Sequence, residues 1–144
     1  MNTKEVNNKV TKELMNEFIN TQFPQSKITV EHVDGESATI RHKITDAELR
    51  PGGTVAGPVM FLVADCALYV GILGRIGIVP LAVTTNMNIN FLRKPSAGRD
   101  IIGVCKLIKV GKTLAIGEVS VYSEGLADPV AHAVGTYAIP PKKD

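Results

Sequence analysis

Apolar residues recur along this chain with two different periods, and the longer period comes first. From Thr3 to Phe23 they are spaced about four residues apart among lysine, glutamate and asparagine, which places them on one side of a helix. We therefore expect an amphipathic helix over about 3–23, ended by Pro24. Its apolar stripe consists of Val6, Val10, Leu14 with Met15, and Phe18.

Six later segments alternate apolar and polar residues, which predicts strands with two different faces. Asp34-Gly35 separates the first two and is typical of a two-residue hairpin turn. The connections between the last strands are too short for parallel crossovers, so we expect antiparallel pairing. The expected strands cover 28–33, 37–44, 83–91, 101–110, 113–123 and 130–139.

Between the second and third strands lies a segment, Pro58 to Gly74, whose only charged residue is Asp65. A segment of this length that is apolar on every side predicts a buried helix, over about 57–75. A carboxylate on such a helix destabilises the fold unless other groups hydrogen-bond it, so it would persist without them only if it has a function. Asp65 is therefore either a functional group or a structural one held by backbone amides or a basic side chain from elsewhere. A membrane span is disfavoured by the short apolar run and its central charge.

The element order predicts an α+β protein, in which a curved antiparallel sheet of about six strands wraps around the long central helix. A sheet that curls over the helix, together with a partner chain, would cover the apolar surface on every side. We expect one domain over 1–144, with the N-terminal helix at about 3–23 and the core at about 27–140.

The composition of the chain argues against several classes of function. The net charge of +2 does not indicate nucleic-acid binding, and the polar N-terminal residues lack the apolar run of a signal peptide, so we expect a cytoplasmic location. Cys66 and Cys105 have neither disulfide nor zinc spacing, and Cys66 is expected to be a core residue. The histidines lie on strand patterns without acid or cysteine at ligand spacing, so no metal site is predicted. They are His32, His42 and His132.

The segment from Arg50 to Arg93, RPGGTVAGPVMFLVADCALYVGI followed by LAVTTNMNINFLRKP, resembles the hotdog-fold thioesterases of the phenylacetic-acid-degradation (PaaI-type) group. In that family a loop, Asn-Pro-x-Gly-x-x-His-Gly-Gly, leads into the central helix, and an acidic residue lies eight positions after the first glycine of its final pair. Gly57 and Asp65 keep this spacing. The resemblance implies a hotdog fold and hydrolysis of acyl thioesters without a cofactor other than the coenzyme A of the substrate.

Three residues depart from the family pattern. Arg50 stands where the family has Asn or Gln, Ala56 where it commonly has His, and Pro58 replaces the second glycine. The missing side chains help the family to orient the attacking water or the thioester. Either Arg50 takes over as a carbonyl or carboxylate binder, or the site is altered or inactive.

A thioester hydrolase needs a carboxylate that activates water or attacks the carbonyl, and a donor for the developing oxyanion. Asp65 fits the first role, and the Gly57 amide at the helix N-terminus fits the second. Eight helical residues span roughly 12 Å, too far for both groups to reach one thioester within one chain. We therefore expect composite sites in a homodimer, which the resemblance also implies, with pairing of dimers into tetramers.

Other candidate residues follow from the resemblance. Tyr69, one turn after Asp65, either lines the acyl pocket, bonds the carboxylate or is a core aromatic. Asn90, in a polar row with Asn86 and Asn88, contacts ligand or partner, or is a solvated residue. Three basic residues lie where the family holds the phosphates of coenzyme A, or else are simply solvated. They are Arg93, Lys94 and Lys112.

Three functions compete at this point. The first is an acyl-CoA thioesterase that uses Asp65 and Gly57. The second is a hotdog protein that binds or senses acyl-CoA without hydrolysis, which the changes at Arg50 and Ala56 would explain. The third is a hydratase or dehydratase, which would need a catalytic histidine that the segment 50–74 lacks.

Overall fold

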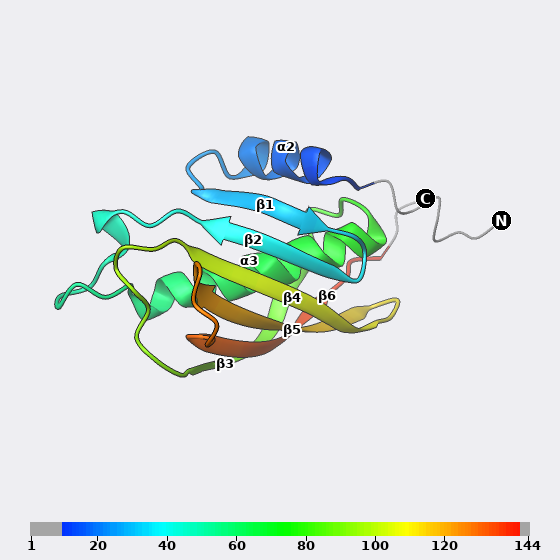
Figure 1. Cartoon of the computed structure of the whole chain (residues 1–144). Coiled ribbons are helices and arrows are strands. Elements are labelled where there is room, and N and C mark those ends of the chain that lie inside the picture. The colour runs from blue at the N-terminus through cyan, green and yellow to red at the C-terminus, as the bar shows by residue number, and fades with distance from the viewer. Residues whose placement is uncertain (1–9, 142–144) are drawn as a thin grey trace.

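The computed structural model describes residues 10–141, in which one six-stranded antiparallel sheet curls around a long helix (Figure 1). This confirms the hotdog architecture expected from the sequence. The elements, in chain order, are α2 Lys12–Gln22, β1 Ile28–Val33, β2 Ser37–His42, the 3-10 helix η1 Asp46–Glu48, α3 Gly57–Ile76, β3 Val83–Phe91, β4 Ile101–Val110, β5 Leu114–Ser123 and β6 Ala131–Ala138.

The strands lie in the order β1-β2-β4-β5-β6-β3, with every neighbouring pair antiparallel. After β2 the chain passes through α3, adds β3 at the far edge, and returns to place β4 beside β2. Strands β1 and β3 are therefore the two edges of the sheet. The core lies between α3 and the concave face of the sheet, which Figure 1 shows wrapped around the helix.

Glycines in the strands under α3 allow the helix to lie close to the sheet. A Cβ at Gly103 of β4 would lie 2.7 Å from a Val63 methyl, and one at Gly117 of β5 would lie 2.6 Å from a Leu68 methyl. Real Cβ atoms do not approach this closely, so these strand positions exclude side chains. The sheet presents a groove where the large apolar residues of α3 fit.

Helix α3 begins at Gly57, with Pro58 in its first turn, and ends at Ile76. The next residue, Gly77, caps it with a φ of 95° that favours glycine. One chain does not bury the helix on every side, because Phe61 and Leu62 are 39% and 48% exposed. The sheet covers the remaining sides of the helix, but it does not close over this one. The sequence assigned this remaining cover to a partner chain, and that part stays a prediction.

We also expected this segment to be too short to span a membrane, and that expectation is wrong. The helix has 20 residues, and its mean hydropathy of 1.9 meets the requirement for crossing a membrane. It is nevertheless the core helix of the described fold. It packs against the sheet, and 61% of its apolar stretch is buried. Length and composition therefore carry little weight here.

The N-terminal helix is described from Lys12, and residues 3–9 of the expected helix lie outside the described range. Its buried residues are Met15 and Ile19, whereas Leu14, which we placed in the stripe, is 43% exposed. The Asn16 side chain explains the position of α2, because it bonds both the N–H and the C=O of Val30 on edge strand β1.

Candidate active site

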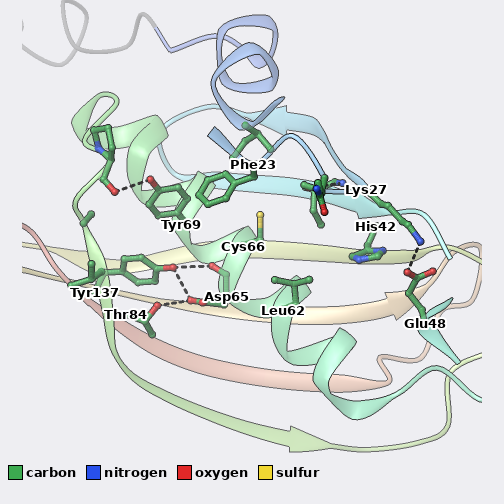
Figure 2. Close-up of a pocket in the computed structure, with 17 residues that line it drawn as sticks. Phe23, Lys27, His42, Glu48, Leu62, Asp65, Cys66, Tyr69, Thr84 and Tyr137 are labelled. Atoms are coloured by element: carbon green, nitrogen blue, oxygen red, sulfur yellow. Dashed lines mark hydrogen bonds and ion pairs between the residues drawn. The ribbon is translucent and has the colours of Figure 1, made fainter. Parts of the chain in front are cut away.

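Asp65 lies on the exposed side of α3 and is held by two hydroxyl groups (Figure 2). Thr84 Oγ1 and Tyr137 Oη each donate to Asp65 Oδ1 at 2.7 Å. The other oxygen, Oδ2, has no partner among residues 10–141. The carboxylate is half-buried, and no basic side chain or backbone amide in the described part of the chain bonds it. Its Oδ1 is therefore fixed, while Oδ2 is free to meet a ligand.

Thr84 reaches Asp65 because strand β3 is irregular. The pairing of β3 with β6 shifts between Thr84 and Asn86, so the alternation of faces is interrupted at this point. Regular alternation along β3 would place Thr84 on the face of Asn86 and Asn88, whereas the shift turns it toward Asp65. Tyr137 is opposite Thr84 in the register, on the inward face of β6.

Tyr137 was missed by the sequence reasoning although a signal was present. Strand β6 buries every second residue, Ala131, Ala133, Gly135 and Tyr137, so its aromatic side chain had to face the helix. Burial raises the pKa of the Tyr137 hydroxyl, and the bond to Asp65 acts in the same direction. The hydroxyl thus stays protonated and able to donate.

A cavity of about 570 Å³ opens beside Asp65, a size that suits a small ligand. Figure 2 shows Phe23 and Tyr69 on one side of it, and Lys27, His42 and Glu48 on another. The cavity therefore has an apolar arm and a polar arm, with Asp65 between them.

The apolar arm is built around Tyr69, which is buried in the core with a bonded hydroxyl. Its ring centroid lies 5.8 Å from that of Tyr137 and 6.4 Å from that of Phe23. Its hydroxyl donates to the Pro80 carbonyl at 3.1 Å, so it does not bond Asp65. Burial raises the pKa of Tyr69, which agrees with a neutral, structural hydroxyl.

Cys66 borders the same cavity, next to Asp65 in the chain. Burial raises the pKa of its thiol to about 12, and the charge of Asp65 adds to this effect. A thiol with such a pKa is not a nucleophile at neutral pH. The expectation that Cys66 is not the reacting group therefore agrees with its surroundings.

A second pocket, of about 400 Å³, lies at the start of α3. It brings together four residues that the sequence singled out, Arg50, Gly57, Arg93 and Lys94, with Phe91 beside them. The first N–H groups of a helix have no acceptor within the helix, and that of Gly57 has none elsewhere among the described residues. This pocket therefore combines a free N–H donor with three cationic side chains.

The last two candidates lie apart from both pockets. Asn90 is exposed on edge strand β3, and Lys112 is exposed in the hairpin between β4 and β5. Figure 1 shows that hairpin at the opposite end of the sheet from the start of α3. Within one chain, neither residue contributes to a pocket that holds Asp65 or Gly57.

The histidines make separate local contacts. His32 pairs with Asp34 and His132 with Glu118, both at the surface, whereas His42 is buried and lines the Asp65 cavity. Residues 10–141 contain no group of three side chains suited to hold a metal ion. The sequence reasoning treated His42 as an ordinary strand residue and missed its place in the cavity.

The curved sheet, the enclosed helix and the acidic residue on it define the class of hotdog proteins, and comparison with known proteins agrees. A Silicibacter structure assigned provisionally as a thioesterase is 40% identical, with a TM-score of 0.85 over 92% of this chain and 94% of that one. Zebrafish thioesterase superfamily member 2 is 20% identical, with a TM-score of 0.82 over 92% of this chain and all of that one.

A variant of the phenylacetic acid degradation protein PaaI from Thermus thermophilus shares the fold at 22% identity, with a TM-score of 0.71 over 86% of this chain and 99% of that one. The hotdog fold that the resemblance implied is thus confirmed. No curated protein matches the chain in sequence.

The family model of the thioesterase superfamily matches residues 52–129, which include the whole of α3 and the strands from β3 to β5. The chain belongs to the thioesterase superfamily. Membership indicates thioester hydrolysis as its general class of reaction.

Proposed function

We propose that this protein hydrolyses acyl-CoA thioesters to a free acid and coenzyme A. The observation that carries the proposal is the arrangement of Asp65, whose Oδ1 is fixed by two hydroxyls while Oδ2 is free beside a cavity of acyl-group size. A carboxylate held in this way is suited to general-base catalysis.

The proposed reaction begins when Asp65 Oδ2 takes a proton from water as the water oxygen attacks the thioester carbonyl carbon. The carbonyl oxygen becomes an oxyanion, which the Gly57 N–H stabilises. Collapse of this intermediate breaks the C–S bond, and the proton on Asp65 passes to the departing thiolate. In the alternative course, Asp65 itself attacks the carbonyl carbon, the C–S bond breaks, and coenzyme A leaves as the thiolate. Water then hydrolyses the resulting anhydride, which releases the acid and restores the Asp65 carboxylate, and the proton that this step frees passes to the thiolate.

Two chains would be needed for one site. Gly57 and Asp65 are separated by eight residues of one straight helix, roughly 12 Å, and they border different pockets. We propose a homodimer in which the Gly57 pocket of one subunit faces the Asp65 cavity of the other, with pairing into tetramers. The exposed side chains of Phe61 and Leu62 on α3 favour such a contact.

The Gly57 pocket would then hold the coenzyme A part of the substrate. Arg50, Arg93 and Lys94 give it the positive charge that suits phosphates. Arg50 is exposed and forms no ion pair within residues 10–141, so it is available for this role or for polarising the carbonyl. Lys112 would take part only if another subunit brought it near.

The first test is thiol release from short, medium, long and aromatic acyl-CoAs by wild type and by Asp65→Asn. We expect hydrolysis of at least one ester by wild type, and a loss of roughly a thousandfold or more in the variant. The Asn carboxamide and the Asp carboxylate have nearly the same shape, so the unfolding curves of wild type and Asp65→Asn should coincide. Undiminished turnover in Asp65→Asn would refute the role of Asp65.

Gly57 offers a matched pair of variants. Gly57→Pro removes the N–H but suits the first turn of a helix, whereas Gly57→Ala keeps it and brings a Cβ only to ordinary contact, 3.8 Å from the Phe91 ring. We expect a fall in kcat of roughly a hundredfold for proline and little change for alanine. Equal effects of the two would exclude an oxyanion role for this N–H.

Mixing the two inactive variants tests the composite site. When Asp65→Asn and Gly57→Pro chains exchange, half of the dimers are mixed, and one of the two sites in each contains an intact pair. Activity should therefore return to about one quarter of the wild-type value. A site formed within one chain predicts no recovery.

A second candidate function is binding of acyl-CoA without hydrolysis, which Ala56 and Arg50 favour because they replace the His and Asn or Gln of the resembled group. Calorimetry would find tight binding of an ester that the wild type does not cleave. A hydratase needs an acidic residue and a histidine, and His42 does border the Asp65 cavity. Enoyl-CoA therefore belongs in the substrate panel.

A further inference from the structure

The hairpin between β4 and β5 carries positive charge that no nearby acidic residue of the chain balances. From Ile101 to Gly117 the sequence has three lysines, Lys106, Lys109 and Lys112, and no aspartate or glutamate. All three lysines are exposed, and none forms an ion pair within residues 10–141. The hairpin therefore presents three unpaired cations to the surroundings.

Exposed aliphatic side chains lie in the same part of the sheet. Val83 of β3 and Leu114 of β5 flank Ala138 of β6 in the register. Because the next residue of β6, Tyr137, faces the helix, these three lie on the convex face. Ile108 is the extra residue where the pairing of β4 with β5 shifts, and it is 58% exposed. We call the exposed group the hairpin patch, and it consists of Val83, Ile108, Leu114, Lys106, Lys109 and Lys112.

A second copy of this chain does not suit the hairpin patch. In a symmetric contact each patch would face its own counterpart, so two sets of three lysines would meet without a carboxylate in either set. Glu118, the first acidic residue after the hairpin, already bonds His132 at 2.9 Å. The patch therefore requires a partner that brings negative charge together with a place for aliphatic side chains.

The kinds of side chain in the patch favour a lipid surface over an acidic protein. The cores of protein interfaces are enriched in tyrosine, tryptophan, phenylalanine and arginine and depleted in lysine, which is the reverse of this patch. An anionic bilayer takes aliphatic side chains into the boundary between headgroups and acyl chains, while lysines keep their charge among the headgroups. The hairpin patch offers both of these contacts.

We propose that the hairpin patch binds the surface of an anionic lipid bilayer, with Ile108 and Leu114 in the interface and the lysines among the headgroups. The protein would lie on the membrane without spanning it, because α3 is the core helix of the fold. The start of α3 is at the opposite end of the sheet (Figure 1), so the Gly57 pocket would stay open to soluble ligands. The proposal goes beyond the proposed function and is independent of it, because binding to a bilayer needs no turnover.

Cosedimentation with vesicles tests the role of charge. We expect the protein to bind phosphatidylcholine vesicles that contain about one third phosphatidylserine, to ignore vesicles of phosphatidylcholine alone, and to be released as the salt rises to about 1 M. Lys106→Gln with Lys109→Gln should weaken binding roughly fivefold for each lysine, about 25-fold together. The matched control is Lys12→Gln with Lys43→Gln, the same change of charge outside the patch, which should weaken binding by less than about twofold.

Fluorescence tests the insertion of the apolar side chains. The chain contains no tryptophan, so Ile108→Trp would give a signal from the patch alone. On addition of the anionic vesicles we expect its emission to shift to the blue, and brominated acyl chains to quench it, because the indole enters the interface. Leu126→Trp, at a 46% exposed position after β5, is the matched control and should show neither effect.

Several results would overturn the proposal. Failure to bind anionic vesicles would do so, as would equal losses in the two lysine pairs or an unchanged emission of Ile108→Trp on vesicles. Tight binding of polyglutamate without binding of vesicles would assign the patch to an acidic protein. Altered self-association of Ile108→Ser with Leu114→Ser, measured by sedimentation without lipid, would assign it to a contact between copies. Unfolding curves identify any variant that fails to fold, and absence of thioester hydrolysis would overturn only the proposed function.

Discussion

Two hydroxyl groups from adjacent strands bind one oxygen of Asp65 and leave the other free. Removing either hydroxyl should let the carboxylate rotate away from its productive orientation. We expect Tyr137→Phe and Thr84→Val each to lower kcat by roughly tenfold to a hundredfold with a smaller change in KM. Thr84→Ser, which keeps the hydroxyl, is the control. Steady-state kinetics with the best acyl-CoA would measure this, and full activity in both variants would contradict it.

Glu48 makes the stability of the fold depend on pH. Burial opposes its ionisation, but hydrogen bonds from Lys27 and Thr45 outweigh burial and lower the pKa of Glu48 from 4.5 to about 2. A carboxyl whose pKa is lowered in the folded state stabilises it above the unfolded-state pKa, and this stabilisation is lost as pH falls from about 4.5 to 2.

The matching prediction concerns Glu48→Gln. At neutral pH we expect its free energy of unfolding to be about 1–2 kcal/mol below that of wild type. The difference should shrink as the pH falls through the window from 4.5 to 2, where wild-type Glu48 also becomes neutral. Denaturant unfolding at a series of pH values would measure it, and a constant difference would exclude this origin.

At the scale of residues, the sequence predicted the two groups whose chemistry does not depend on strand register. Asp65 was conspicuous because its segment has no other charge, and Gly57 because it begins the helix. Thr84 could not be found, because a one-residue irregularity in β3 moved it to the other face. Of the alternatives for Tyr69, a bond to Asp65 is excluded, because Tyr137 makes that bond and the Tyr69 hydroxyl bonds Pro80. A contact of Tyr69 with the acyl group stays a prediction.

The glycines of the strands under α3 set how closely helix and sheet can approach. Gly117→Ala would place a Cβ 2.6 Å from a Leu68 methyl and 3.2 Å from the Lys106 carbonyl oxygen. We expect a loss of about 1–3 kcal/mol in the free energy of unfolding. Gly98→Ala, where a Cβ meets nothing within 4 Å, is the control and should change it by less than about 0.5 kcal/mol. Both are measured at one protein concentration, and equal stabilities would contradict the packing argument.

At the scale of elements, types and order were predictable because the apolar periods of helix and strand differ. Strand ends shifted by only a residue or two, as where β2 ends at His42 instead of 44. The buried side of α2 was predicted one position away from where it lies, because Leu14, Met15 and Phe18 fit two overlapping apolar stripes. Asn16 decided between these, since its two bonds to Val30 fix the rotation of α2 against β1.

At the scale of the whole molecule, one side of α3 exposes apolar surface that the sheet does not cover. We expect Phe61→Glu to weaken self-association and to abolish activity, because a charge would enter the proposed contact between subunits. Ile108→Glu, at another exposed apolar position in the β4–β5 hairpin, is the control. Sedimentation across a range of concentrations would measure both, and an unchanged assembly of Phe61→Glu would place the interface elsewhere.

The whole architecture could be predicted because the resemblance and the element order pointed to the same fold. The sequence indicated that α3 needs cover from both the sheet and a partner chain, but periodicity could not tell which side of the helix the sheet leaves open. That side is the one with Phe61 and Leu62. The grouping of Arg50, Gly57, Arg93 and Lys94 in one pocket depended on the path of the loop after β3. No spacing rule supplies that path.

One wall of the Asp65 cavity belongs to the short connection between α2 and β1, where Phe23 and Gln25 are largely exposed. A residue that supports no core can change identity, and the connection can change length, at little cost in folding. The opposite wall, on α3, has no such freedom. New substrate preferences can therefore arise by drift in this connection while the reacting groups stay fixed, so closely related chains could diverge in substrate before they diverge in fold.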